Sequence, residues 1–160
     1  ILPLAEAVGD KGFVSGIDLS EGMLTVAEQK LKKVNLQNRV RLECGDARQL
    51  PYADESFDSV YISFTLELFA SQDISIVLQE IRRVMKPDGR LCVVAMAKRE
   101  QINLITQLYE WSHRRFPQVI DCRPIEVVGI LKENGFVVEQ VEEMSLFGLP
   151  VDVVLTRTGR

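Results

Sequence analysis

Two carboxylates follow short apolar runs in the first third of the chain, and together they could hold a nucleoside. Asp18 ends the run FVSGID, and Asp46 stands two residues after the run VRLEC. A carboxylate can accept hydrogen bonds from the paired hydroxyls of a ribose, and a second one can accept from the exocyclic amine of adenine. In open α/β sheets, ligands bind beyond the carboxyl ends of the strands. The two acids therefore predict an adenosine site.

Each candidate residue also has a simpler interpretation. Asp18 could cap the helix that follows it, and Asp46 could be an ordinary turn residue. We favour ligand binding because the two acids would contact adjacent parts of one adenosine. Met23 could pack on the adenine face, although a helical methionine is more often core. Ser63, at the end of a later strand, could reach the same ligand or bond to a backbone carbonyl nearby.

The elements that would position these residues alternate between strand and helix. Apolar runs predict strands at residues 13–18, 40–44, 60–64, 90–97, 136–142 and 151–157. Apolar residues at helical spacing predict helices at 1–8, from Ser20 to 34, from Ser71 or Asp73 to 85, at 101–116 and at 124–134. The alternation predicts an α/β fold, Rossmann-like, with one mostly parallel twisted sheet and helices on both faces. The connection from 143 to 150 is too short for a parallel crossover, so we expect an antiparallel last strand.

The composition narrows the class of protein. The chain has 160 residues, of which 46% are hydrophobic and 26% charged, which predicts one globular domain over residues 1–160. A net charge of -4 argues against a nucleic-acid binder. We find no apolar run of membrane-spanning length and no signal-peptide pattern. Cys44, Cys92 and Cys122 are far apart in apolar runs and predict core thiols in a reducing, cytoplasmic compartment, with neither a disulfide nor a metal site.

Longer motifs surround the two acids. The segments GIDLSEGML, LECGDARQLPYADESFDSVYISF and EIRRVMKPDGRL resemble class I S-adenosylmethionine-dependent methyltransferases. FDSVYISFTLELF followed by QEIRRVMKPDGRLCVV is most similar to the ubiquinone/menaquinone C-methyltransferase (UbiE-type) group. The resemblance implies S-adenosylmethionine as cofactor, with its ribose on Asp18 and its adenine on Asp46 and Ala47. Leu19, Met23 and Ser63 would complete the cofactor site.

The resemblance also implies what lies outside the sequence. In this family a first strand and a glycine-rich loop precede a helix like residues 1–8. The sequence begins after that point, so we expect it to be part of a longer protein.

The acceptor side is less defined in the sequence. The resemblance implies a small-molecule methyl acceptor, a quinone precursor or a lipid-like compound, and leaves peripheral contact with a membrane open. Methyl transfer from a sulfonium needs alignment more than acid–base chemistry, and no general base is evident. Pocket candidates are Glu67, just past the third strand, and Tyr109, Trp111 and His113 on a helix that could act as a lid. We favour the simpler interpretation of His113 and its two following arginines as a solvated face. Arg123 could join the pocket or pair with Asp121.

Two other functions are compatible with parts of the pattern. An NAD(P)-dependent oxidoreductase also has an acid after its second strand, but the pair Asp46–Ala47 and the antiparallel last strand disfavour it. A non-catalytic module could keep the fold as a binding surface. The strand-end acids favour the enzyme.

Overall fold

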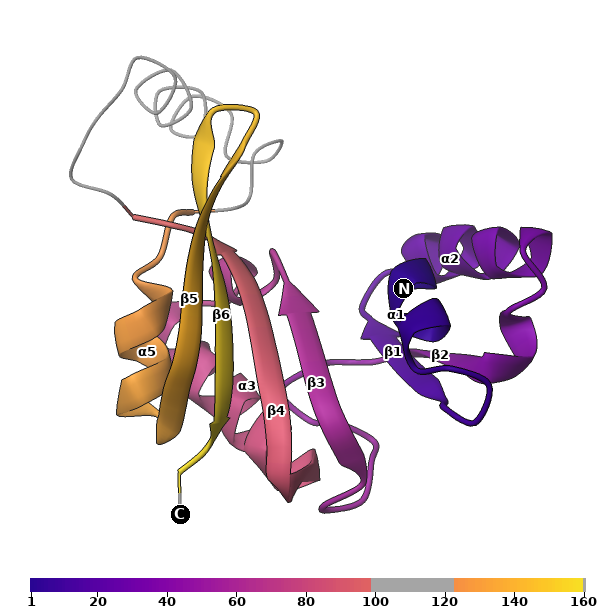
Figure 1. The fold of residues 1–160 in the computed structure, drawn as a ribbon, viewed down its shortest axis with the longest axis horizontal. Coiled ribbons are helices and arrows are strands. Elements are labelled where there is room, and N and C mark those ends of the chain that lie inside the picture. The colour runs from indigo at the N-terminus through magenta and orange to yellow at the C-terminus, as the bar shows by residue number, and fades with distance from the viewer. Residues whose placement is uncertain (99–122, 160) are drawn as a thin grey trace. The chain divides into compact units, whose positions relative to one another are not determined.

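The structure, a computed structural model, describes residues 1–98 and 123–159. The chain forms two compact units, Ile1–Pro51 and Tyr52–Arg160, and the elements of each are labelled in Figure 1. The predicted helix at 101–116, with Tyr109, Trp111 and His113, lies outside the described residues, as does Cys122.

The first unit is a two-stranded parallel sheet with two helices. Its elements are α1 (Leu2–Ala7), β1 (Val14–Asp18), α2 (Glu21–Lys33), the 3-10 turn η1 (Gln37–Arg39) and β2 (Val40–Cys44). In the ladder, Val14 lies opposite Val40 and Asp18 opposite Cys44. Ala5, Leu31 and Val40 are buried at the centre, and flanking apolar side chains such as Val14 and Leu42 pack against them. The helices thus hold both strands by apolar contacts.

Burial in the first unit departs from the sequence prediction at two places. Phe13, just before β1, is 58% exposed, so the apolar run of β1 is only partly covered. The prediction of a core thiol at position 44 is wrong, because Cys44 is exposed, with its Sγ donating to the Leu19 carbonyl oxygen at 3.6 Å. An apolar run alone does not show whether the last residue of a strand projects past the packed part of the sheet.

The second unit contains a four-stranded mixed sheet. Its elements are β3 (Phe57–Ser63), η2 (Leu66–Leu68), α3 (Ser71–Val84), β4 (Met85–Met96), α5 (Val127–Glu133), β5 (Phe136–Leu146) and β6 (Leu149–Thr158). The strand order is β3-β4-β6-β5. β3 runs parallel to β4, whereas β6 runs antiparallel to both β4 and β5. The predicted antiparallel last strand is confirmed, since a two-residue connection allows no other direction.

Hydrogen bonds join the described strands into two sheets, one in each unit. The pattern of each strand indicates its type and its buried positions. This pattern does not show which strands pair with one another, because pairing depends on contacts between distant segments.

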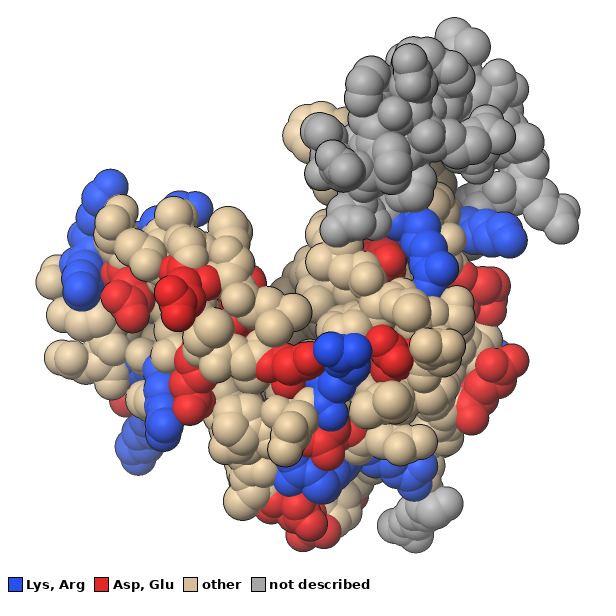
Figure 2. All heavy atoms as spheres, turned by 180° about the vertical axis from the view of Figure 1, so that it is seen from behind, with Lys and Arg blue, Asp and Glu red and all other residues tan. Residues whose placement is uncertain are grey.

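Helix α3 covers the sheet of the second unit with the predicted apolar stripe. Ile74, Val77, Leu78, Ile81 and Val84 are all buried. The helix begins one residue earlier than a cap at Ser71 would place it: Ala70 is the N-cap and makes no side-chain bond. It ends at Val84, and the chain turns directly into β4. On the face seen in Figure 2, basic and acidic side chains are interspersed over each unit.

Candidate functional site

The carboxyl ends of β1 and β2 bring Asp18 and Asp46 to one edge of the first unit. Asp18 is the last residue of β1 and lies opposite Cys44. The Gly45 N–H donates to the Asp18 carbonyl oxygen at 3.1 Å, so Asp46 follows immediately beyond the last rung of the ladder. The structure therefore places both acids at the carboxyl ends of neighbouring strands, the edge where ligands of such sheets bind.

Asp18 is exposed, and one of its oxygens is uncommitted. Oδ1 accepts a hydrogen bond from the Ser20 N–H at 2.8 Å. Among the residues that the structure describes, Oδ2 has no hydrogen-bond partner. A carboxylate oxygen has lone pairs for two hydrogen bonds, so Oδ2 could accept from a hydroxyl of a ligand.

Ser20, and not Asp18, is the N-cap of α2. The Ser20 Oγ accepts from the Met23 N–H at 3.3 Å, as predicted for a cap at this position. The capping interpretation of Asp18 is weakened, because the first turn of the helix already has its cap.

The cap leads to a measurable expectation for stability. Ser20→Ala should lower the free energy of unfolding by about 1 kcal/mol, because the Met23 N–H loses its partner. Ser20→Asp should restore most of the loss, since aspartate caps as well as serine. Urea denaturation followed by circular dichroism measures both variants. Equal losses for alanine and aspartate would show that the hydroxyl does not act as a cap.

Asp46 is engaged by a residue that the sequence reasoning missed. The Arg48 guanidinium bonds to both carboxylate oxygens, with Nη2 2.7 Å and Nε 2.9 Å from Oδ2, and the Arg48 N–H donates to Oδ1 at 2.9 Å. These bonds from Arg48 hold the pKa of Asp46 below its ordinary value. Asp46 is thus a charged acceptor, which an adenine amine would share with Arg48. The sequence does contain a signal for this ion pair, because Arg48 has the opposite charge and stands two residues after Asp46.

Apolar side chains lie beside Asp18 on the surface of the same unit. Leu19 is 66% exposed and Met23 is 59% exposed, so the alternative of a core methionine at position 23 is wrong. Ala47, next to Asp46, is half-buried. Exposed apolar groups beside a carboxylate fit a ligand that combines a polar sugar with a flat base.

The second unit places Ser63 at the carboxyl end of β3. Ser63 lies opposite Val94 of β4 and is half-buried. The predicted alternative, a serine hydroxyl bonded to a backbone carbonyl, is not found among the described residues. Phe64 follows with a φ of 49°, a left-handed conformation that costs free energy for a bulky residue. Strained backbone of this kind is concentrated at functional sites.

Glu67 is a buried acid at the same end of this sheet. It is 2% exposed, and its Oε1 accepts from the Met96 N–H at 2.8 Å. Oε2 is buried and has no hydrogen-bond partner among the residues that the structure describes. Burial raises the pKa of this carboxyl above its ordinary value, against the opposing effect of the Met96 N–H. A buried acid with a raised pKa at a strand end is a candidate for contact with substrate.

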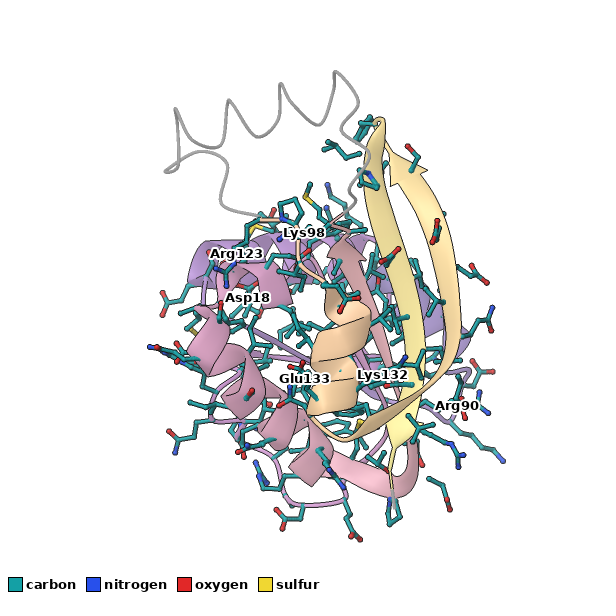
Figure 3. The ribbon with its side chains drawn as sticks, turned by 90° about the vertical axis from the view of Figure 1, so that its left-hand side faces the viewer. Asp18, Arg90, Lys98, Arg123, Lys132 and Glu133 are labelled. Carbon is teal, nitrogen blue, oxygen red and sulfur yellow. The ribbon has the colours of Figure 1, made fainter. Side chains whose placement is uncertain are left out.

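Arg123 is held against the start of α3. Its Nη2 donates to the Phe69 carbonyl oxygen at 2.8 Å and to the Ser71 Oγ at 3.1 Å. Figure 3 shows Arg123 and Lys98 near one another above α5. The predicted alternative partner, Asp121, lies outside the described residues.

Other features of the described residues are not part of this site. A cavity of about 360 Å³ beside Met85 and Pro87 lies at the amino end of β4, away from the strand-end residues. The part of the chain that the structure describes has no group of three potential metal ligands. Its helices are all too short or too polar to span a bilayer.

The comparisons with known proteins agree with the strand-end chemistry. Residues 1–122 match the profile of the ubiE/COQ5 methyltransferase family. The demethylmenaquinone methyltransferase of Geobacillus stearothermophilus is 51% identical over 88 residues, which are 55% of this chain and 36% of that protein. Its counterpart in Lactobacillus johnsonii is 44% identical over 93 residues, which are 58% of this chain and 37% of that protein. The chain thus spans little more than a third of these relatives.

The fold comparison gives the same class. The crystal structure of an S-adenosylmethionine-dependent methyltransferase from Aquifex aeolicus has a TM-score of 0.70 and 25% sequence identity to this chain. The match covers 98% of this chain and 76% of that one. This confirms the predicted Rossmann-like α/β class. Because the family profile extends over most of the sequence, the chain belongs to the ubiE/COQ5 methyltransferase family.

Proposed function

We propose that this protein binds S-adenosylmethionine and transfers its methyl group to a small quinone-type acceptor. The observation that carries the proposal is Asp18 at the carboxyl end of β1, whose Oδ2 accepts no hydrogen bond from the described residues. The chain also belongs to a methyltransferase family. The acceptor is inferred from relatives named demethylmenaquinone methyltransferase. Two free thiols, Cys44 and Cys92, fit a reducing compartment, and we propose the cytoplasm.

The described residues of the first unit fit the adenosine part of this cofactor. The ribose hydroxyls would donate to the open oxygen of Asp18, and the adenine amine would donate to Asp46, which stays ionised beside Arg48. Leu19 and Met23 would cover apolar faces of the nucleoside, which explains their exposure. Ala47 follows Asp46 and would lie at the edge of the adenine.

The second unit carries two further candidates, Ser63 for the cofactor and Glu67 for the acceptor. When bound, the cofactor supplies an electrophilic methyl group on a sulfonium, and the protein aligns the acceptor with it. The Ser63 hydroxyl and the Glu67 carboxyl are polar groups at the carboxyl end of β3 with capacity for a further hydrogen bond. We assign Ser63 to the cofactor side and Glu67 to an oxygen of the acceptor. Tyr109, Trp111 and His113 stay proposals from the sequence.

Calorimetry with S-adenosylmethionine and with NAD tests the cofactor assignment. We expect binding of S-adenosylmethionine and none of NAD, and transfer of a labelled methyl group to demethylated quinones in the presence of the former. Preference for NAD would contradict the proposal and favour the oxidoreductase. Binding of S-adenosylmethionine without transfer to any acceptor would favour the non-catalytic module.

A further inference from the structure

The turn between β5 and β6 places a large apolar residue in an unfavourable position. Leu146 pairs with Leu149, so Phe147 and Gly148 form a two-residue hairpin turn. Their φ angles are 52° and 82°, both left-handed. This type of turn favours Asn-Gly or Asp-Gly, whereas a phenylalanine is strained there. Phe147 is also 91% exposed, so packing within the described residues does not compensate for the strain.

The chain segment around Phe147 carries no charge. The segment from Met144 to Pro150, MSLFGLP, has no charged residue, and we call it the hairpin tip. Met144 is 57% exposed and Leu146 is 45% exposed. Three exposed side chains are too few for a specific protein interface, which needs about 1,000 Å² of buried surface. They suffice for shallow insertion into a lipid phase, which needs no complementary partner surface.

The hairpin tip lies at the carboxyl end of the parallel strands of its unit. Met96, the last residue of β4, pairs with Val151 of β6, so the tip extends beyond the end of β4. Figure 1 shows the β5–β6 turn standing above the ends of β3 and β4. Ser63 and Glu67 lie at this same end of the sheet. Exposed Lys98 follows β4 here and could meet lipid phosphates.

We infer that the hairpin tip is a membrane wedge, which inserts Phe147 and its apolar neighbours into a lipid bilayer. The inference rests on the proposed function, because an apolar quinone-type acceptor partitions into lipid, and an enzyme that acts on it gains from contact with the bilayer. The acidic residues Glu142 and Glu143 precede the tip on β5 and limit the depth of insertion. The wedge therefore binds through apolar burial and does not require anionic lipid.

Co-sedimentation of the full chain with phosphatidylcholine vesicles tests the wedge. Phe147→Asn should weaken vesicle binding about tenfold, as expected from loss of one buried aromatic side chain. Its urea midpoint should stay the same or rise, since asparagine is favoured at this turn position. Phe13→Asn is the matched control, because Phe13 is 58% exposed but precedes β1 in the other unit, and its vesicle binding should equal that of the wild type.

Several outcomes would overturn the wedge. These are unchanged vesicle binding of Phe147→Asn, an equal loss in Phe13→Asn, or a loss that follows a lowered urea midpoint. A self-association that Phe147→Asn abolishes, in sedimentation equilibrium without lipid, would show that a second copy occupies the tip instead.

The wedge and the proposed function can fail separately. Phe147→Asn should keep its affinity for S-adenosylmethionine and its transfer to a short-chain, water-soluble quinone, and lose transfer only to a vesicle-borne quinone. If Phe147→Asn transfers methyl groups to both acceptors and binds vesicles as the wild type does, the wedge is contradicted and the proposed function stands. If vesicle binding depends on Phe147 but the wild type transfers no methyl group to either acceptor, the proposed function is contradicted and the wedge stands.

Discussion

Replacement of Asp18 by alanine is expected to weaken the binding of S-adenosylmethionine about tenfold or more. Asp18 ends β1 with Oδ2 open at the ligand edge of the first unit. Hydrogen bonds to a charged acceptor contribute roughly 1.5–3 kcal/mol, and about 1.4 kcal/mol corresponds to a factor of ten in affinity. Calorimetric titration of the wild type and the variant measures the difference.

Two controls separate binding from structure. Folding should change little in Asp18→Ala, because the exposed side chain has few packing contacts to lose. Asp10→Ala removes another exposed acid of the same unit, in the turn before β1, and should leave the affinity unchanged. An unchanged affinity in Asp18→Ala together with a lower urea midpoint would show that Asp18 serves the start of α2 through the Ser20 N–H, and the ribose assignment would be wrong.

Replacement of Glu67 by alanine is expected to lower the free energy of unfolding by about 2–4 kcal/mol. The Met96 N–H would lose the acceptor that now lies 2.8 Å away, which costs roughly 1–3 kcal/mol for a buried group. A cavity left by the 98% buried side chain adds to the loss. Urea denaturation measures it. Gln140→Ala, on the exposed face of β5, is the control and should have almost no effect.

Glutamine at the same position isolates the charge of Glu67. Glu67→Gln keeps an acceptor for the Met96 N–H and stays neutral at every pH. Burial raises the folded-state pKa of Glu67 above its ordinary value. The stability from the neutral carboxyl is therefore complete below the ordinary pKa of a glutamate and is lost as the pH rises through the raised pKa. The wild type should match the glutamine variant at pH 4 and be less stable at pH 8.

The pH comparison also bears on the acceptor. If Glu67 contacts an oxygen of the acceptor, Glu67→Gln should change kcat or KM for the quinone and leave the affinity for S-adenosylmethionine as it is. A stability difference that stays constant from pH 4 to pH 8 would mean that the carboxyl is not shifted, and unchanged kinetics would remove Glu67 from the acceptor site.

Several features of this protein follow from local patterns in its sequence. Apolar periodicity placed most strands and helices, because burial repeats at the period of each element. The ends of β1 and β2 placed Asp18 and Asp46 at one edge, since parallel strands end on the same side. The short chain between β5 and β6 determined the antiparallel direction of β6. Ser20 was recognisable as a cap from the residue type and its place before a helix.

Other features depend on contacts between distant segments or on side-chain direction, and these became known from the three-dimensional structure. The order of the strands within each sheet follows from edge pairing, which no local pattern encodes. The burial of Glu67 depends on its contact with Met96, 29 residues further along the chain. The exposure of Cys44 and the left-handed backbone of Phe147 break the rules of composition and turn preference. Such exceptions depend on the three-dimensional environment of each residue. The sequence gives the residue type but does not show this environment.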